Sequence, residues 1–310
     1  MRNKIPGLLP AGTGGLGLRD SGLAILVMLL WGYNFAVAKV GVGEFPPIFM
    51  VGLRFLLSAM ILAPFFPLPR SRIREIAAVS VVLGAGHFSI YFTGLKGLDA
   101  STAAIASQLQ VPFSVLLATV LLSDPPGWRR MLGMAVSFGG IVLIAGEPRF
   151  AGSMVSLGLV IASSFLWAVA NIQVKQLGKI DEMALLAWMS AMAAPQLFLL
   201  SWLLEDGQVA SLGTATWRGW GAVVFQAVIV VGLCYGIWYR LLARHSVNSV
   251  VPYTLLAPVF GVIASVMVLD ETITGRVLVG GIVTIMGVGI IALRRPHLAD
   301  PVPDTTVDRN

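Results

Sequence analysis

Charged residues are scarce in this sequence. Only 12% of its 310 residues are Asp, Glu, Lys or Arg, whereas 57% are hydrophobic and the mean hydropathy is +0.86. A typical soluble domain carries about 25% charged residues. The composition excludes an ordinary soluble globular protein and predicts an all-α, polytopic membrane protein.

Cysteine is nearly absent as well. Cys234 is the single cysteine, so an intrachain disulfide and a cysteine-based metal cluster are excluded. No His or Cys group has metal-ligand spacing, no phosphate-binding loop follows a strand, and no catalytic triad can be assembled. The sequence therefore predicts no metal, no cofactor and no enzymatic or ATP-driven activity.

Carboxylates are missing from the middle of every apolar stretch. All 15 acidic residues fall at helix ends, in loops or in the tails. A lone cation in a low dielectric needs an anionic partner. Exchange of cationic drugs for protons is thus disfavoured, and a zwitterionic or neutral substrate fits better.

What the chain does contain is a series of apolar blocks. A spanning helix needs about 20 apolar residues. Ten blocks cover about 20–41, 46–66, 75–95, 100–122, 128–146, 153–175, 183–204, 217–240, 247–268 and 274–294. Residues 1–19 are expected to form a cytoplasmic tail, and 295–310 a disordered tail. Residues 36–38 resemble a signal-peptidase site, but the same local pattern recurs mid-chain, so no cleavage is predicted.

The distribution of basic residues predicts the topology. The net charge of +6 could suggest nucleic-acid binding, but Lys and Arg lie at the edges of the apolar blocks and not on one helical face. With both termini in the cytoplasm, only five basic residues fall at outer ends, and these are Lys39, Lys96, Arg149, Arg218 and Arg276. We predict a multi-pass protein of the cell inner membrane that binds no nucleic acid.

The two halves of the chain repeat one another. The first and sixth blocks share a Trp-to-Lys spacing, at Trp31 and Lys39 and at Trp167 and Lys175. The third and eighth blocks share a pattern, at Gly84, His87 and Tyr91 and at Gly232, Tyr235 and Tyr239. The fourth and ninth blocks share a mid-helix proline, and the fifth and tenth share glycine pairs, Gly133 with Gly139 and Gly281 with Gly287.

This repeat predicts inverted halves. Residues 20–146 and 147–294 each hold five blocks, and an odd number places the two halves in opposite orientations. Inverted repeats form a binding site near the membrane midplane where the halves meet. The fold expected is therefore ten transmembrane helices in two inverted five-helix repeats.

The chain resembles the EamA-type branch of the drug/metabolite transporter superfamily. The residues that carry the resemblance are Leu30-Trp31-Gly32, Arg54-Phe55, Pro112, Pro258 and Asp270-Glu271. The resemblance implies ten helices around a central cavity and export of amino acids, including aromatic ones. Ser123-Asp124 departs from the Gly-Glu pair common in the family, which leaves the role of that turn open.

His87 and Arg54 are the ionisable candidates for the cavity. His87 is the one histidine within a predicted span, and it is a natural proton switch unless it only bonds a neighbouring helix. A central Arg costs about 2.5–3.5 kcal/mol on insertion scales, so Arg54 requires a partner or water. It could attract a substrate carboxylate, cap backbone carbonyls or extend outward to the interface.

The remaining candidates are neutral. Pro112 and Pro258 are predicted to break their helices and free backbone carbonyls. Trp188, Trp202, Trp217, Trp220 and Trp238 are expected in interfacial belts. The predicted cavity residues are Trp31, Asn34, Arg54, His87, Tyr91, Ser107, Gln108, Gln110, Trp167, Asn171, Tyr235, Tyr239 and Tyr253.

The predicted function is a secondary exporter of amino acids and related small metabolites, with rocking of the third, fourth, eighth and ninth helices. The alternatives are a broad drug/metabolite or nucleotide-sugar-like exchanger and, in another class, a channel. The expected partners are a small-molecule substrate and membrane lipid, and the chain is expected to act as a monomer. Facilitated diffusion and proton antiport both stay open.

Overall fold

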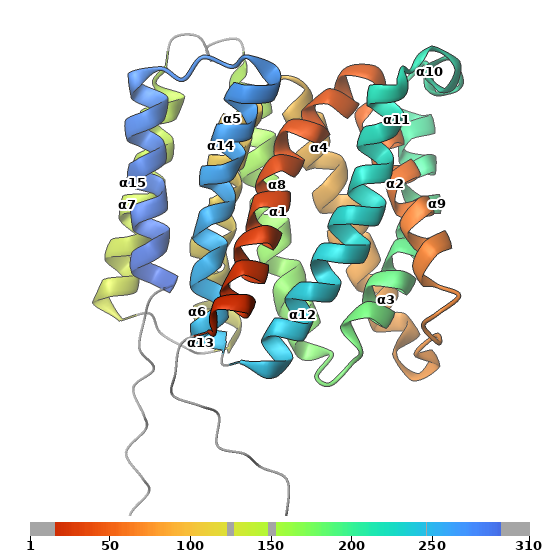
Figure 1. The fold of residues 1–310 in the computed structure, drawn as a ribbon, viewed down its shortest axis with the longest axis horizontal. Helices are drawn as coiled ribbons and strands as arrows, with labels where there is room; N and C mark the ends of the chain where they lie inside the picture. Colours follow the sequence, from red (N-terminus) through yellow and green to blue (C-terminus); the bar gives the residue numbers. More distant parts are fainter. Residues whose placement is uncertain (1–15, 123–126, 148–152, 246, 293–310) are drawn as a thin grey trace, which may run out of the picture.

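The computed structural model describes residues 16–122, 127–147, 153–245 and 247–292. Every regular element among them is helical (Figure 1). Helices satisfy their backbone hydrogen bonds internally, which a lipid-embedded chain requires. Most of the two predicted tails and the Ser123-Asp124 turn lie outside the described residues.

The first half contains five spans. They are α1 (Leu18–Glu44), α2 (Pro47–Leu62), a third built from η1 (Arg70–Arg72), α3 (Ile73–Val79), η2 (Ser80–His87) and α4 (Phe88–Lys96), a fourth built from α5 (Ala100–Ala106), η3 (Ser107–Leu109) and α6 (Gln110–Leu122), and α7 (Trp128–Ala145).

The second half repeats this order. Its spans are α8 (Met154–Gln176), α9 (Glu182–Leu204), an eighth built from α11 (Trp217–Val224), η5 (Phe225–Cys234) and α12 (Tyr235–Arg244), a ninth built from α13 (Val247–Val250), η6 (Val251–Leu255) and α14 (Leu256–Leu269), and α15 (Gly275–Ala292). The described residues hold 9 long apolar helical stretches and the shorter apolar α2, which confirms the prediction of ten spans. A short helix between spans, α10 (Gln208–Thr214), was not predicted.

Contacts at the two ends of α1 define the two ends of the bundle. At its start, Asp20 Oδ2 lies 2.6 Å from His245 Nε2 of the loop after α12. At its finish, Glu44 accepts hydrogen bonds from the backbone N and Oγ1 of Thr216, at 2.6 and 2.7 Å. We refer to these as the Asp20 end and the Glu44 end, which lie at the bottom and top of Figure 1.

The helix that opens the second half starts where α1 finishes. Lys39, near the finish of α1, donates to the carbonyls of Leu95, Lys96 and Leu98, so α4 also finishes at the Glu44 end. Ser156, at the start of α8, packs against Gly97, just beyond α4. α8 therefore runs opposite to α1, as inverted halves require.

The halves exchange their third and eighth spans. α1 packs against η5 and α12 of the second half, while α8 packs against η2 and α4 of the first half. In the same way α2 contacts η5 and α9 contacts η2. Two walls bound the interior, one where α1 and α2 pack against η5 and one where α8 and α9 pack against η2. We call them the mixed walls, because each combines spans from both halves.

Glycines let α7 and α15 pack at one edge of the bundle (Figure 1). A Cβ on Gly140 would overlap the Gly280 carbonyl, and a Cβ on Gly133 would overlap the Gly287 carbonyl. A Cβ on Gly139 would meet nothing within 4 Å. Small residues at such crossings let backbones approach closely.

π-helical segments interrupt the third and eighth spans at corresponding places. η2 ends at His87, and η5 ends one residue before Tyr235. A π-turn closes its hydrogen bonds over five residues instead of four; it is rare and is frequently found at functional sites. The widened turns set the direction in which the residues that follow point from these spans.

Short 3₁₀ turns break the fourth and ninth spans. η3 precedes α6 and η6 precedes α14, and Pro112 and Pro258 lie in the first turns of these two helices. A proline fits the first turn because it needs no donor there. Each break therefore lies just before its proline and not at the proline itself.

Candidate functional site

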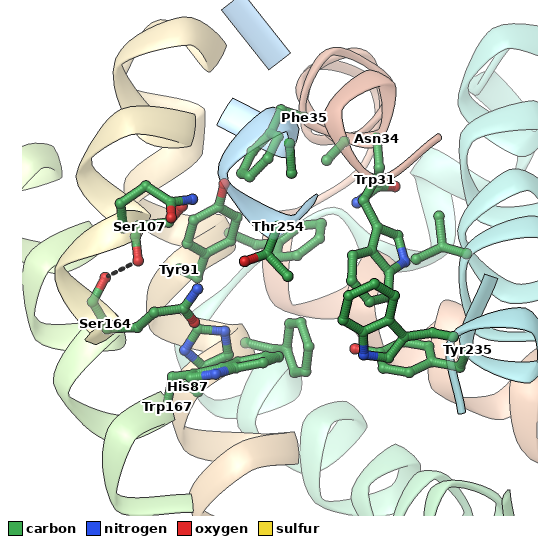
Figure 2. Close-up of a pocket in the computed structure, with 18 of the residues that line it drawn as sticks. Trp31, Asn34, Phe35, His87, Tyr91, Ser107, Ser164, Trp167, Tyr235 and Thr254 are labelled. Carbon is green, nitrogen blue, oxygen red and sulfur yellow. Dashed lines mark hydrogen bonds between the residues drawn. The ribbon is translucent and has the colours of Figure 1, made fainter. Parts of the chain in front are cut away.

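A cavity of about 380 Å³ lies between the mixed walls. Its lining comes from both halves (Figure 2). Eleven of the predicted cavity residues are in this lining: Trp31, Asn34, Arg54, His87, Tyr91, Ser107, Gln108, Gln110, Trp167, Tyr235 and Tyr239. Spans that are far apart in sequence supply them, because inversion brings corresponding positions to one centre.

Two aromatic clusters face one another across this cavity (Figure 2). In one, Trp167 lies 4.9 Å from His87 and Tyr91 lies 5.9 Å from the same ring, measured between centroids. In the other, Tyr235 lies 5.3 Å from Trp31 and 5.7 Å from Tyr239. The clusters match residue by residue, and in each the tryptophan comes from one half and its partners from the other.

The imidazole of His87 is the chemical difference between the clusters, because a phenol occupies its place at Tyr235. Nδ1 of His87 lies 2.7 Å from the carbonyl oxygen of Ser163 in α8. A carbonyl only accepts, so Nδ1 carries a proton and Nε2 of the neutral ring is an acceptor. His87 therefore ties η2 to α8 and can still accept a proton or a hydrogen bond.

Arg54 is the basic residue of the cavity. It lies about 10 Å along α2 from Pro47 and is only 5% exposed. Its guanidinium is 4.6 Å from the Phe88 ring centroid, a cation–π distance. Its one hydrogen bond among the described residues is a long contact of 3.4 Å from Nη1 to Gln226 Oε1.

Buried polar atoms without partners gather in the cavity wall. Trp31 Nε1, Asn34 Oδ1, Arg54 Nε and Tyr91 OH make no hydrogen bond within the described structure. Buried polar groups are nearly always paired, and an unpaired one costs about 1–3 kcal/mol. Such atoms mark places where water or a ligand supplies the missing partner.

Two predicted residues lie elsewhere. Tyr253 donates from its hydroxyl to Ser21 Oγ at 2.9 Å and packs beside α1, because the η6 turn directs it away from the cavity. Asn171 is exposed and lines the adjoining hollow, since it lies one helical turn beyond Trp167 toward the Asp20 end of α8. Neither residue is in the lining of the central cavity.

The two prolines are not in the lining, but the residues four positions earlier are. A proline cannot donate to the carbonyl four residues before it. For Pro112 and Pro258 these carbonyls belong to Gln108 and Thr254, and both residues line the cavity. The broken spans thus bring matching backbone positions of the two halves to the site.

Trp238 does not lie in an interfacial belt, where the sequence analysis expected it. It is buried, lines the cavity and lies 5.4 Å from Trp31 between ring centroids. The eighth span is long, so Trp238 sits about 9 Å inside the helix end at Arg244. Its one-turn spacing from Tyr235 was the signal that could have placed it.

Other lining residues escaped the sequence analysis. Phe88 and Ser164 adjoin predicted residues, at one step from His87 and one turn from Trp167. Gln226 is fully buried and does not line the cavity, but its Oε1 accepts the hydrogen bond from Arg54. No sequence pattern marks Gln226, because its importance arises only from the packing of η5 against α2.

A second hollow of about 410 Å³ leads from the cavity toward the Asp20 end. It shares Gln110, Val111 and Trp167 with the cavity and continues past Ser114 to Arg130 at the start of α7. α6 runs toward the Asp20 end, so these residues trace a route in that direction.

Carboxylate caps hold the Glu44 end together. Glu271 accepts from the backbone N of Ala100 at 2.6 Å and of Ser101 at 3.0 Å, at the start of α5. Glu205 accepts from the backbone N of Ile48 at 2.8 Å and of Phe49 at 3.0 Å, at the start of α2. A carboxylate at a helix N-terminus satisfies free N–H groups and favours the helix dipole.

No Asp or Glu is among the residues that line the cavity. Within the described parts of the chain, no group of three or more His, Cys, Asp or Glu is arranged to hold a metal ion. The site therefore offers one fixed cation, aromatic faces, amides and hydroxyls to a guest molecule.

The model of the EamA-like transporter family matches residues 21–146 and again 154–293. This chain belongs to the EamA-like transporter family. The two matches cover the two halves in turn, so this EamA-like protein has a two-repeat architecture. It is a multi-pass membrane transporter.

This EamA-like protein matches its curated relatives over almost their whole length. A probable amino-acid metabolite efflux pump of Salmonella typhimurium is 31% identical over 283 residues, covering 88% of this chain and 94% of the relative. The Escherichia coli protein of the same description is 27% identical, with the same coverage. A probable terminal-alkyne amino-acid exporter of Streptantibioticus cattleyicolor is 26% identical and covers 87% of this chain and 92% of its own.

A solved crystal structure shares the fold. It superimposes with a TM-score of 0.58 at 18% identity, covering 89% of the EamA-like chain and 96% of the solved one. At that identity the match supports the fold alone.

Proposed function

We propose that this EamA-like protein is a secondary exporter of amino acids, aromatic ones included, and of related small metabolites. The observation that carries the proposal is the central cavity, which two aromatic clusters and one buried arginine line without any carboxylate. Aromatic faces suit apolar and aromatic side chains, and the lone arginine disfavours cationic guests. Relatives described as amino-acid efflux pumps and exporters agree with this substrate class.

Alternating access supplies the mechanism. The carboxylate caps and Lys39 close the Glu44 end, while the second hollow leads toward the Asp20 end. Substrate enters at the Asp20 end, binds between the aromatic clusters and leaves after the third, fourth, eighth and ninth spans rock to open the Glu44 end. The breaks at η3 and η6 and the π-turns of η2 and η5 provide the hinges.

We place the Asp20 end in the cytoplasm of a cell whose inner membrane holds the protein, with both termini on that side. Basic residues support this orientation, because Arg70, Arg72, Arg130 and Arg244 all belong to the Asp20 end. Export then runs from the hollow to the capped end.

The test is transport in proteoliposomes with a panel of labelled amino acids, with and without a pH gradient. A carrier gives saturable uptake and counterflow, whereas a channel gives neither. Trp167→Ala removes one face of an aromatic cluster and should abolish most of the flux. Trp202→Ala, at a position 75% exposed on α9, is the matched control and should transport normally.

Failure of every amino acid to accumulate or exchange would refute the proposal. Equal flux through the Trp167→Ala and Trp202→Ala variants would refute the assignment of the cavity as the binding site.

A further inference from the structure

We propose that Arg54 binds a free carboxylate of the transported molecule, and that the cavity selects carboxylates without requiring a charged amino group. This inference rests on the proposed export of amino acids and narrows its substrate class to compounds with an unblocked carboxyl group, among them 2-hydroxy acids.

The guanidinium lacks the partners that a buried charge requires. Of its five N–H donors, one makes a long bond of 3.4 Å to the neutral amide of Gln226, and Nε has no hydrogen-bond partner. No Asp or Glu of the described residues forms an ion pair with Arg54. A buried charge without an ion pair or a full set of hydrogen bonds is strongly disfavoured.

The two structural roles open to a membrane arginine do not account for Arg54. It makes no hydrogen bond to a backbone carbonyl among the described residues, so it does not cap a broken helix. It is only 5% exposed and packs on Phe88 and Phe55, at 4.6 and 5.3 Å from their ring centroids, so it does not extend to the interface. Its place in the cavity lining leaves a guest molecule to supply the anion.

The charge belongs to one half only. α9 packs on η2 as α2 packs on η5, and there Gln196 Nε2 donates to Ser80 Oγ at 2.8 Å. This contact joins two neutral side chains, and the second half contributes no Lys or Arg to the cavity lining. The two aromatic clusters match one another across the cavity, but Arg54 makes only one wall electropositive. A bound carboxylate should therefore face that wall.

The other unpaired atoms point to the same class of guest. Trp31 Nε1 and Arg54 Nε can only donate, and Tyr91 OH can donate as well. Asn34 Oδ1 is the single obligatory acceptor among the unpaired atoms of the lining. A carboxylate brings the acceptors that these donors lack, whereas an ammonium group finds only neutral acceptors and aromatic faces.

Matched analogues of one side chain test the inference. The probes are L-phenylalanine, its amide, which keeps the ammonium group and loses the carboxylate, and L-3-phenyllactate, which keeps the carboxylate and loses the ammonium group. The equivalent leucine set covers an aliphatic side chain. Binding is followed by tryptophan fluorescence of the purified protein, and transport by competition with the labelled amino acid in proteoliposomes.

We expect the hydroxy acid to compete nearly as well as the amino acid and the amide to compete about 10- to 100-fold more weakly, the range for losing a charge-assisted, bidentate bond. Arg54→Gln should remove this preference, and Arg54→Lys should keep part of it because the charge stays without the planar fork. Arg218→Gln, at an exposed position of α11, should retain the full preference.

An amide that competes as well as its parent acid would overturn the inference while export of amino acids stands. Absence of binding and transport for both sets would refute the proposed function and the inference together. If Arg54→Gln does not elute as a folded protein, the analogue series on the unaltered chain decides the question by itself.

Discussion

Replacement of Glu271 by Gln perturbs the Glu44 end of the bundle with little change of shape. Glu271 follows the ninth span and joins it to the start of the fourth. Its carboxylate accepts from the backbone N of Ala100 at 2.6 Å, and from the backbone N and Oγ of Ser101 at 3.0 and 2.6 Å. The glutamine amide has one acceptor oxygen where the carboxylate has two.

The magnitude follows from these bonds. The amide oxygen can still accept from Ala100, and the amide nitrogen can donate to Ser101 Oγ, but the backbone N–H of Ser101 then faces a donor. A hydrogen bond to a charged group contributes about 1.5–3 kcal/mol, and a neutral one about 0.5–1.5 kcal/mol. The lost bond and the lost charge together should lower the unfolding free energy by about 2–3 kcal/mol.

The assay is reversible unfolding in mixed detergent micelles, read by tryptophan fluorescence. Glu75→Gln is the control, because Glu75 pairs with Arg72 at 3.4 Å in a half-exposed ion pair that should contribute less than about 1 kcal/mol. Equal stability of the Glu271→Gln and Glu75→Gln variants would refute the assignment of Glu271 as a stabilising cap of α5.

Two of three further predictions use neighbouring or repeat-related controls. Gly140→Val should destabilise the α7–α15 crossing and lower the thermal midpoint, because its side chain meets the Gly280 carbonyl, while Gly139→Val, which faces open space, should not; equal midpoints would contradict this packing. Lys39→Gln should weaken the Glu44 end by loss of charged bonds to three carbonyls at 2.8–2.9 Å, and Lys175→Gln, at its exposed repeat mate, should leave stability unchanged in the same unfolding assay. His87→Ala should reduce transport in proteoliposomes because it removes the hydrogen bond from Nδ1 to the Ser163 carbonyl and opens the cluster with Trp167; intact transport of every tested substrate with unchanged pH dependence would remove His87 from the site.

Much of the fold could be predicted because lipid imposes simple rules. Apolar length predicts a span, and an odd number of spans in each repeat predicts inversion. The repeat pattern pairs Trp31 with Trp167 and His87 with Tyr235. These pairs do occupy corresponding places in the two aromatic clusters. The π-turns could not be predicted, because no residue preference distinguishes them from the surrounding apolar helix.

The kinds of residue in the candidate site could be predicted from the sequence, but the direction in which each side chain points was less predictable. Polar and aromatic side chains within a span favour the interior, and most of the candidates do line the cavity. Tyr253 does not, since the 3₁₀ break of η6 turns its side chain toward α1, and Asn171 does not, since one helical turn carries it about 5.4 Å along α8 beyond Trp167. Trp238 was missed for the converse reason, because the eighth span extends farther than its apolar block.

Composition, block length and internal repetition by themselves determined that this is a ten-span, two-repeat membrane protein with a chamber poor in negative charge. These features depend on how each segment partitions between water and lipid, which is a local property of the chain. Only the tertiary structure decided that each tryptophan meets its partners from the opposite half, that Arg54 lies beside Gln226 and pairs with no carboxylate of the described residues, and that Glu271 caps α5. These contacts join residues far apart in sequence, and the packing of inverted halves alone brings them together.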